Sequence, residues 1–324
     1  MCVSPILLYG IRRFIYMLTF IREKFISVSL QMLIHQLSGD DGLAASTLLM
    51  TRNRVSYFDL TLTSLKCQVL PRKSWEVIVV DEASQDDTPA VLDSYESHLP
   101  LVCLRSEKRC ERATLLNEAV TVAKGHILVF LSDDRLAQPD FLMQHLLLHM
   151  QKECVVIGDD HRCIYTHLFA PDELAQEGIL PQPLLTPADL NDPQQMATLT
   201  FPGENNYAPL FAYFDQQKQS PPFPWACFSL ANASVPKEAV ERVGGFDTGL
   251  DFGLEATDLA CRLHQAGVPL RFAPKAITLR QLRPDKPGNP RDLAQNLTRF
   301  HCKHPHLNPM EQEIIRRGRY APTA

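Results

Sequence analysis

Apolar runs that alternate with stretches of helical spacing constrain the fold of this 324-residue chain more than any other feature. Residues 75–81 contain the run Glu-Val-Ile-Val-Val, and residues 126–131 contain Ile-Leu-Val-Phe-Leu. Both are typical of strands that are buried on two faces. Such strands, alternating with helices, predict a parallel sheet, and a sheet of this kind binds ligands at the carboxyl ends of its strands. The polar residues that follow each strand are therefore the first candidates for a site.

The pattern predicts an α/β fold with a mostly parallel central sheet and helices on both faces. The expected strands are residues 46–51, 75–81, 101–104 and 126–131. The expected helices are residues 55–67, 87–98, 112–123, 139–150, 237–243, 254–266 and 292–302.

We expect one main domain, residues 46–284, preceded by a helical extension and followed by a tail with a short helix. Its middle part is rich in Pro, Gln and Asn without a sustained period, which predicts a loop-rich insertion that covers a substrate. The boundaries are 1–45 for the extension, 46–158 for the first half, 159–224 for the insertion, 225–284 for the second half and 285–324 for the tail.

The extension at residues 1–45 is apolar but is interrupted by Arg12, Arg13, Arg22 and Lys24, so no run is long enough to span a membrane. Two interpretations remain: an amphipathic helix on a membrane surface, or a helix packed on the domain or lying outside the fold. The nine cysteines include no C-x-x-C pair, which favours reduced thiols in a cytoplasmic protein, with peripheral contact at the membrane face as the second possibility. A net charge of -5 argues against a general nucleic-acid binder.

Two acidic turns follow expected strands. Asp81, Glu82 and Ser84 come after the second strand and are suited either to a ligand's ribose or base, or to capping the next helix. Asp133 and Asp134 come after the fourth strand. Two adjacent carboxylates require a cation or solvent between them, so this turn is either a metal site for a diphosphate or a solvated acidic turn.

These turns and several further segments together resemble the inverting family-2 glycosyltransferases of the GT-A fold, over residues 46–305. The segments that carry the resemblance are Thr51-Arg52-Asn53-Arg54, residues 80–84, Lys108-Arg109-Cys110 with Leu116-Asn117-Glu118-Ala119, residues 131–134, Pro224-Trp225, residues 232–237 and Gly244-Gly245-Phe246-Asp247. The last three are closest to the branch with a galactosyltransferase-like C-terminal region.

The resemblance implies that a sugar moves from a nucleotide-sugar, expected to be a UDP-sugar, to a glycan, lipid-linked or small-molecule acceptor, with inversion. A divalent ion, Mn²⁺ or Mg²⁺, would steady the diphosphate leaving group, held by Asp134. The implied donor-binding residues are Thr51, Asn53, Arg54, Asp81, Glu82, Ser84, Arg109, Asn117, Asp133 and Arg280. The implied acceptor-binding residues are Trp225, Asn232, Gly245, Phe246 and Asp247.

Three positions depart from the family's pattern. Ser132 stands where the D-x-D metal motif has a carboxylate, Ala256 stands where the catalytic base is expected, and Arg280 stands where a histidine completes the metal site. Alanine cannot take a proton, and arginine stays protonated and does not ligate a cation.

Two hypotheses account for the departures. In the first, Arg280 replaces the metal's charge at the diphosphate and either Glu255 or Asp258 acts as base, which gives a metal-independent enzyme. In the second, catalysis is lost and the chain is a binding or scaffold subunit. The sequence itself does not choose between them.

Several residues that coordinate metals in other proteins receive a plainer interpretation. His145 and His149, four apart, are expected on an exposed or partly buried helix face. His301, His304 and His306 are interpreted as part of a solvated tail, and Cys261 as a core thiol.

Overall fold

The structure is a computed structural model. It describes residues 32, 34, 35, 37, 42–168, 178, 182–203, 224–250, 254–283 and 290–307.

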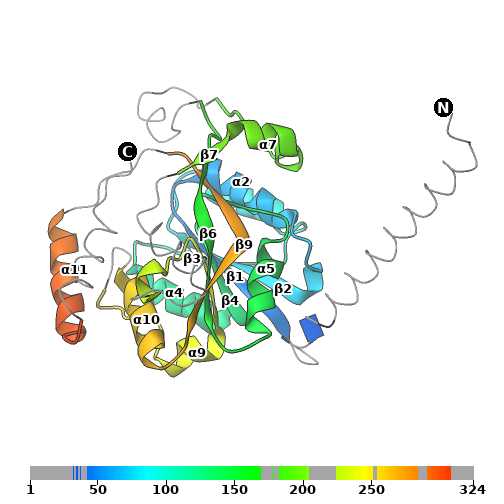
Figure 1. Ribbon diagram of the computed structural model, residues 1–324. Coiled ribbons are helices and arrows are strands. Elements are labelled where there is room, and N and C mark those ends of the chain that lie inside the picture. Colours follow the sequence, from blue (N-terminus) through cyan, green and yellow to red (C-terminus); the bar gives the residue numbers. More distant parts are fainter. Residues whose placement is uncertain are drawn as a thin grey trace, which may run out of the picture.

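Strands and helices alternate through the first half, as the apolar runs predict (Figure 1). The elements are β1 (Leu43–Thr51), α2 (Val55–Lys66), η1 (Arg72–Ser74), β2 (Trp75–Glu82), α3 (Thr88–Tyr95), β3 (Leu101–Ser106), α4 (Arg112–Val122), β4 (Gly125–Leu131), β5 (Arg135–Ala137) and α5 (Phe141–His149). The second half contains β6 (Val155–Ile164), η2 (Asp189–Asn191), α7 (Pro193–Leu199), β7 (Thr200–Pro202), η3 (Pro224–Cys227), β8 (Asn232–Pro236), α9 (Lys237–Arg242), α10 (Leu254–Gln265), β9 (Leu270–Gln281) and α11 (Pro290–Lys303).

Within the described residues, nine strands form one sheet in the order β3-β2-β1-β4-β8-β6-β9-β5, with β7 paired to β6. The first four strands are parallel, as predicted. Strand β8 is antiparallel to β4 and to β6, and β6 is parallel to β9. The carboxyl ends of β1, β2 and β4 therefore lie at one edge, where Thr51 is the register partner of Asp81.

Alternating side chains of the central strands enter two different cores, because successive residues of a strand point to opposite faces. Ile78 and Val80 of β2 belong to the core that α4, α9 and α10 cover. Val77 and Val79 of the same strand belong to the core beneath α2, α3 and α5. Helices thus cover both faces of the sheet, as the α/β pattern predicts (Figure 1).

Several strands of the second half were not predicted. Strand β6 continues to Ile164 through the polar run Asp159-Asp160-His161-Arg162, and its pairing with β9 shifts register on both sides of Asp159. This polar run lacks the apolar pattern of a buried strand, so the expected start of the insertion, residue 159, lies inside β6. The described part of residues 159–224 also contains α7 and β7.

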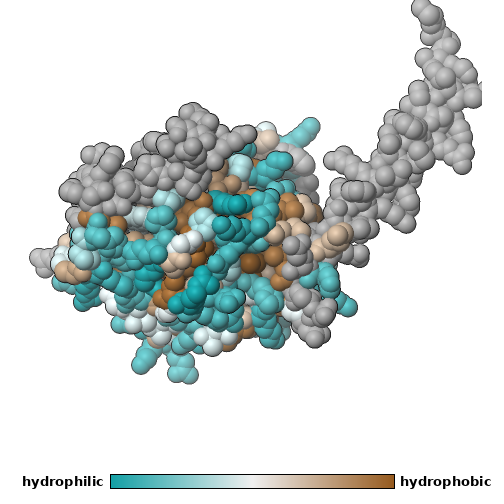
Figure 2. Space-filling view, turned by 60° about the horizontal axis from the view of Figure 1, so that its bottom comes forward, coloured by the Kyte–Doolittle hydropathy of each residue, from teal (hydrophilic) through white to brown (hydrophobic). Residues whose placement is uncertain are grey.

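The C-terminal helix packs on the domain and is not a solvated tail. Phe300 of α11 and Leu307 after it are buried in the core that includes Leu259 and Leu263 of α10. Hydrophobic burial therefore fixes residues 293–307 as part of the fold. On the view of the surface in Figure 2, hydrophilic residues cover much of the described face, with hydrophobic residues between them.

The expected membrane contact at Arg12, Arg13, Arg22 and Lys24 lies outside the described residues. Of the extension, the structure describes helical residues 32, 34, 35 and 37 and the residues from 42 on, where β1 begins three positions before the expected strand. Among the described helices, none has the length and apolar character required to cross a bilayer.

The histidine pair of α5 is buried, whereas an exposed or partly buried helix face was expected. His145 lies 2.9 Å from the Ser234 hydroxyl and 2.9 Å from Asn232 Oδ1, and His149 lies 2.8 Å from the same hydroxyl. Burial lowers the pKa of His145 to about 4 and that of His149 to about 3. Both are therefore neutral hydrogen-bonding residues of the core.

Candidate functional site

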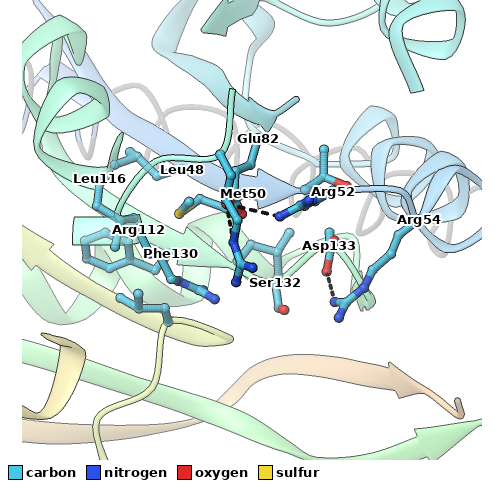
Figure 3. Close-up of a pocket in the computed structure, with 14 residues that line it drawn as sticks. Leu48, Met50, Arg52, Arg54, Glu82, Arg112, Leu116, Phe130, Ser132 and Asp133 are labelled. Carbon is cyan, nitrogen blue, oxygen red and sulfur yellow. Dashed lines mark hydrogen bonds and ion pairs between the residues drawn. The ribbon is translucent and has the colours of Figure 1, made fainter. Parts of the chain in front are cut away.

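A pocket of about 240 Å³ lies at the carboxyl ends of β1, β2 and β4 (Figure 3). This is the edge at which a parallel sheet is expected to bind its ligand. The lining residues are Leu48, Met50, Thr51, Arg52, Arg54, Glu82, Arg109, Arg112, Leu116, Phe130, Leu131, Ser132, Asp133 and Leu230.

Four arginines among the described residues line this pocket and give it an excess of positive charge over its two acidic residues. Arg52 and Arg109 lie 3.5 and 3.6 Å from the carboxylate of Glu82. The side chains of these two arginines are 39% and 75% exposed. Partly exposed ion pairs of this kind are weak, so the guanidinium groups can turn to an anion at small cost.

Hydrogen bonds between Asn53 and residues 84–85 hold together the loops that follow β1 and β2, and each loop contains one residue with a left-handed backbone. Asn53 has φ 49° and Ala83 has φ 53°, values that are rare outside glycine. The Asn53 amide N–H donates to the Ser84 hydroxyl at 3.0 Å, and the Gln85 N–H donates to Asn53 Oδ1 at 2.7 Å. Asn53 and Ser84, both predicted as donor-binding, thus also fix the shape of the pocket's rim.

Asp81 is fully buried at the end of β2. One carboxylate oxygen accepts a hydrogen bond from the Ser84 N–H at 3.0 Å. The other, Oδ2, lies 3.5 Å from Arg105 Nε and has no hydrogen bond with any described residue. A buried carboxylate oxygen normally has a hydrogen-bond donor, so this oxygen is available to a ligand's N–H or O–H group.

Asp133 lies in the pocket wall and pairs with Arg54 at 3.0 Å (Figure 3). Burial raises the pKa of Asp133 above its ordinary value, Arg54 opposes this, and the charge of Asp134 adds to it. The side chain of Arg54 is 31% exposed, so this pair is the part of the acidic turn that a ligand can reach.

Asp134, the expected metal ligand, is held by two arginines. Its Oδ1 lies 2.6 Å from Arg135, and its Oδ2 lies 2.8 Å from Arg283. Burial by itself would raise the pKa of Asp134, but the charges of Arg135 and Arg283 outweigh this and hold the pKa well below its ordinary value.

Arg280, which was expected at the diphosphate, is the register partner of Arg135, and within the described part of the chain it makes no ion pair with Asp133 or Asp134. Arg283, three residues later, occupies the role of counter-charge to Asp134. The chain direction after β9 decides which arginine reaches the turn, and the sequence gives no sign of it.

Glu255 lies in the first turn of α10 and is fully buried. Its carboxylate is 3.4 Å from Arg112 Nε, and Arg112 also lines the pocket. The neighbouring Ala256, at the position expected for the base, packs into the core. The structure therefore connects Glu255 to the pocket through a guanidinium.

Asp258, the alternative base, faces another part of the molecule. Its carboxylate lies 2.7 Å from Arg262, 2.9 Å from Lys303 and 2.8 Å from His304 Nε2. Although burial acts to raise it, these partners lower the pKa of Asp258 to about 2. Because its oxygens are occupied by α10 and the C-terminal segment, Asp258 connects these two elements and does not line the pocket.

Most residues expected at the acceptor belong to the core or to its connections. The Asn117 amide bonds the backbone N–H and C=O of Phe246, both at 2.8 Å, and a side chain on Gly245 would come within 2.6 Å of it. Asn117, which was expected at the donor, therefore joins α4 to this turn and does not line the pocket. Phe246 is buried and contacts Phe130 edge-on at 5.8 Å.

The other three expected acceptor residues also have structural contacts. Trp225 is 2% exposed within the core. Asn232 is buried and bonds Ala276 O at 2.9 Å as well as His145. Asp247 forms an ion pair with Lys303. The described residues therefore do not form an acceptor subsite from this set.

The family model described as "Glycosyl transferase family 2" matches residues 46–232, which is more than half of the chain and includes every strand end of the pocket. The chain belongs to glycosyl transferase family 2. Membership in this family of transferase enzymes confirms the resemblance inferred from the motifs, whereas the galactosyltransferase-like branch stays a prediction.

Relatives of the family 2 chain are themselves glycosyltransferases by name. This chain is 28% identical to the uncharacterized glycosyltransferase YfnE of Bacillus subtilis (strain 168), and the match covers 81% of this chain and 70% of the relative. It is 29% identical to a validoxylamine A glucosyltransferase of Streptomyces hygroscopicus subsp. jinggangensis, over 82% of this chain and 62% of the relative. The chain thus spans less than two thirds of the second relative's length.

Solved structures of low identity share the fold. S. aureus TarS 1-349 in complex with UDP-GlcNAc has a TM-score of 0.57 at 16% identity, and the match covers 85% of this chain and 71% of that chain. A mannosyltransferase of Pyrobaculum calidifontis in complex with GDP-Man and Mn²⁺ has a TM-score of 0.52 at 20% identity, with 90% and 76% covered. The GT-A type fold expected for family 2 is thereby confirmed.

The acidic turn of this family 2 chain is poorly suited to a divalent ion. Hard cations require free carboxylate oxygens, and Ser132 supplies none, while Arg54, Arg135 and Arg283 already neutralise Asp133 and Asp134. Among the described residues, no third acidic, His or Cys side chain converges with this pair. The local charge would therefore oppose a cation, although divalent metal use is plausible for the family.

Four arginines of the site were not predicted as site residues: Arg52, Arg112, Arg135 and Arg283. Arg52 lies inside the Thr51–Arg54 segment, and Arg112 lies at the start of an expected helix. Because both follow expected strands, the sequence could have identified them as candidate site residues. Arg135 and Arg283 are not recognisable in this way, because only tertiary packing brings them to Asp134.

Proposed function

We propose that this chain transfers a sugar from a nucleoside diphosphate sugar, with UDP-sugars as first candidates, to an acceptor hydroxyl with inversion. The observation that carries the proposal is the pocket at the strand ends, where four guanidinium groups border about 240 Å³ of space. Guanidinium groups bind phosphate oxygens in a bidentate manner and carry a permanent charge. The names of the relatives and the UDP-GlcNAc bound by TarS support a nucleotide-sugar as the anion.

In this proposal, Arg54, Arg109 and Arg112 hold the diphosphate. Their side chains are 31%, 75% and 45% exposed, and each has an acidic partner within 3.6 Å: Asp133, Glu82 and Glu255 respectively. A diphosphate that binds beside these pairs offers each guanidinium group more negative charge and more acceptor oxygens than a single carboxylate does.

The nucleoside is proposed to lie toward the end of β2. Asp81 Oδ2 is buried and has no hydrogen bond among the described residues, and it lies beside the rim that Asn53 and Ser84 shape. A base N–H or a ribose hydroxyl would satisfy this oxygen. Without such a donor, its burial costs free energy on the order of 1–3 kcal/mol.

Transfer then requires a base for the acceptor hydroxyl, and we propose Glu255. The acceptor oxygen attacks the anomeric carbon, its proton passes to the Glu255 carboxylate, and the bond from that carbon to the phosphate oxygen breaks. The nucleoside diphosphate leaves with the bonding electron pair, and the guanidinium groups stabilise the negative charge that develops on it. One displacement of this kind inverts the anomeric centre.

We further propose that donor binding does not depend on a divalent cation. Asp134 is held at 2.6 Å by Arg135 and at 2.8 Å by Arg283, and Ser132 contributes no carboxylate. The arginines supply positive charge at the place where a metal would otherwise do so. The predicted Mn²⁺ or Mg²⁺ is therefore dispensable in this proposal.

The test is a donor screen with the full chain. UDP-, GDP- and dTDP-sugars are titrated by calorimetry, once with Mn²⁺ and once with EDTA, and donor hydrolysis is followed by release of the nucleoside diphosphate. We expect one nucleotide class to bind with equal affinity, within about threefold, under both conditions. Product configuration is then read by NMR on the first acceptor that reacts, from glycans, lipid-linked sugars and small molecules.

The outcomes separate the two hypotheses of function. Binding with hydrolysis or transfer supports the enzyme. Binding to no donor by a folded sample overturns the proposal and favours the alternative of a binding or scaffold subunit. Binding that EDTA abolishes leaves the transferase in place and overturns its metal independence.

A further inference from the structure

Behind α10, away from the pocket, the segment that follows α11 brings two histidines to a buried cysteine. Cys261 of α10, His304 and His306 each offer one ligand atom, and these three atoms lie within 4.8 Å of one another. Cys261 is 1% exposed and His304 is 2% exposed, whereas His306 is exposed. The histidines therefore do not belong to a solvated tail.

The hydrogen bonds around this cluster show which of its atoms are acceptors. A carboxylate only accepts, so His304 Nε2 donates to Asp258 at 2.8 Å, and in the neutral ring Nδ1 presents its lone pair to Cys261 Sγ at 3.6 Å. The Gln265 side-chain amide lies 2.7 Å from His306 Nε2 and 3.4 Å from Cys261 Sγ. An amide N–H that donates to both makes both of them acceptors.

The separation between the ligand atoms of Cys261 and His304 fits a tetrahedral zinc ion, and the His306 ligand atom lies within 4.8 Å of both. Zinc–sulfur and zinc–nitrogen bonds of about 2.3 and 2.0–2.1 Å at the tetrahedral angle give a sulfur–nitrogen separation of about 3.6 Å. The separation of Cys261 Sγ and His304 Nδ1 is also 3.6 Å. Thiolate and imidazole are the donor types that zinc prefers.

A buried carboxylate holds the His304 ring from its other side. Asp258, fully buried, accepts the His304 Nε2–H and is itself held by Arg262 and Lys303. A carboxylate that accepts from the remote nitrogen of a histidine fixes the ring for metal binding and increases its basicity. A histidine in a solvated tail would not be buried against such a carboxylate.

We infer that Cys261, His304 and His306 form a zinc site, with water in the fourth position. The ion would attach the segment after α11 to α10, the helix whose first turn carries Glu255. The metal-free account is a hydrogen bond from the Cys261 thiol to His304 Nδ1, together with one from the Gln265 amide to His306 Nε2.

The test is a Co²⁺ and Zn²⁺ titration of the full chain after chelation. A thiolate bound to Co²⁺ gives a charge-transfer absorption band, and Zn²⁺ removes it by displacement. We expect one equivalent to bind, and Zn²⁺ to raise the midpoint of thermal unfolding. Cys261→Ser should abolish the band, and His306→Ala should weaken Co²⁺ binding at least about tenfold.

Matched controls use exposed residues of the same types. Cys302→Ser on α11 and His264→Ala on α10 should keep the wild-type affinity. His306 is exposed, so His306→Ala tests the site even if Cys261→Ser does not fold. No band in folded wild-type protein, or a band that His306→Ala leaves unchanged, overturns the inference, while donor binding at the pocket, measured in parallel, stays an independent result.

Discussion

The guanidinium of Arg112 lies 3.4 Å from the fully buried carboxylate of Glu255 and at the same time lines the pocket at the strand ends. One side chain thus connects the proposed diphosphate site to the proposed base. In the proposed mechanism, a donor that draws Arg112 toward its phosphates would remove positive charge from beside the Glu255 carboxylate, which favours uptake of the acceptor's proton. Donor binding would in this way prepare the base before an acceptor reacts.

Glu255→Gln removes the proton acceptor and keeps the shape of the side chain. We expect kcat to fall about 10²- to 10⁴-fold while the donor dissociation constant changes less than about threefold. Calorimetry and a transfer assay measure the two separately. Glu118→Gln on the exposed face of α4 is the matched control and should have wild-type kcat. A wild-type rate in Glu255→Gln would exclude Glu255 as base.

Arg112→Ala removes one of the guanidinium groups from the pocket. A hydrogen bond to a charged group contributes about 1.5–3 kcal/mol, which predicts donor binding weaker by about 10- to 150-fold. Arg242→Ala breaks an ion pair with Glu153 on the surface and serves as the control. If both variants bind the donor equally well, the diphosphate does not lie against Arg112.

Arg283→Ala should convert the acidic turn toward a metal site. The substitution leaves Asp134 Oδ2 without its partner at 2.8 Å and removes one positive charge beside Asp133. We expect Mn²⁺ affinity to rise at least about tenfold over wild type, because a freed carboxylate oxygen is a suitable ligand. Electron paramagnetic resonance of free Mn²⁺ gives the affinity. An unchanged affinity would mean that the arginines are not what disfavours the cation.

The buried histidines of α5 predict a loss of stability in mild acid. In the unfolded chain each takes a proton near pH 6.5, but burial lowers the pKa of His145 to about 4 and that of His149 to about 3. Between these values the unfolded state binds more protons, so the free energy of unfolding falls as the pH decreases from 6.5 to 4.

The expected size of this loss is a few kcal/mol, since one unit of pKa corresponds to about 1.4 kcal/mol. Urea unfolding at several pH values measures it, and His149→Gln should flatten the slope. His98→Gln, at an exposed histidine, should leave the slope unchanged. A wild-type slope in His149→Gln would show that His149 is not the responsible group.

The first half of the fold was predictable because its signals are local. The strand predicted at residues 75–81 is β2 at Trp75–Glu82, and the helix predicted at 112–123 is α4 at Arg112–Val122. Continuous apolar runs identify strands buried on both faces, and periodicity identifies the helices between them. The polar second part of β6 carries neither signal. Its strand conformation comes from pairing with β9 and β7, which are distant in the sequence.

The sequence by itself determined the α/β architecture, the family and the edge of the sheet at which the pocket lies, since these depend on residue order along the chain. Only the tertiary structure decided that Arg283 rather than Arg280 meets Asp134, and that Asp258 meets His304 rather than the pocket. These pairs join residues 149 and 46 positions apart. Their energies depend on burial and on distances of a few ångströms, which no local pattern encodes.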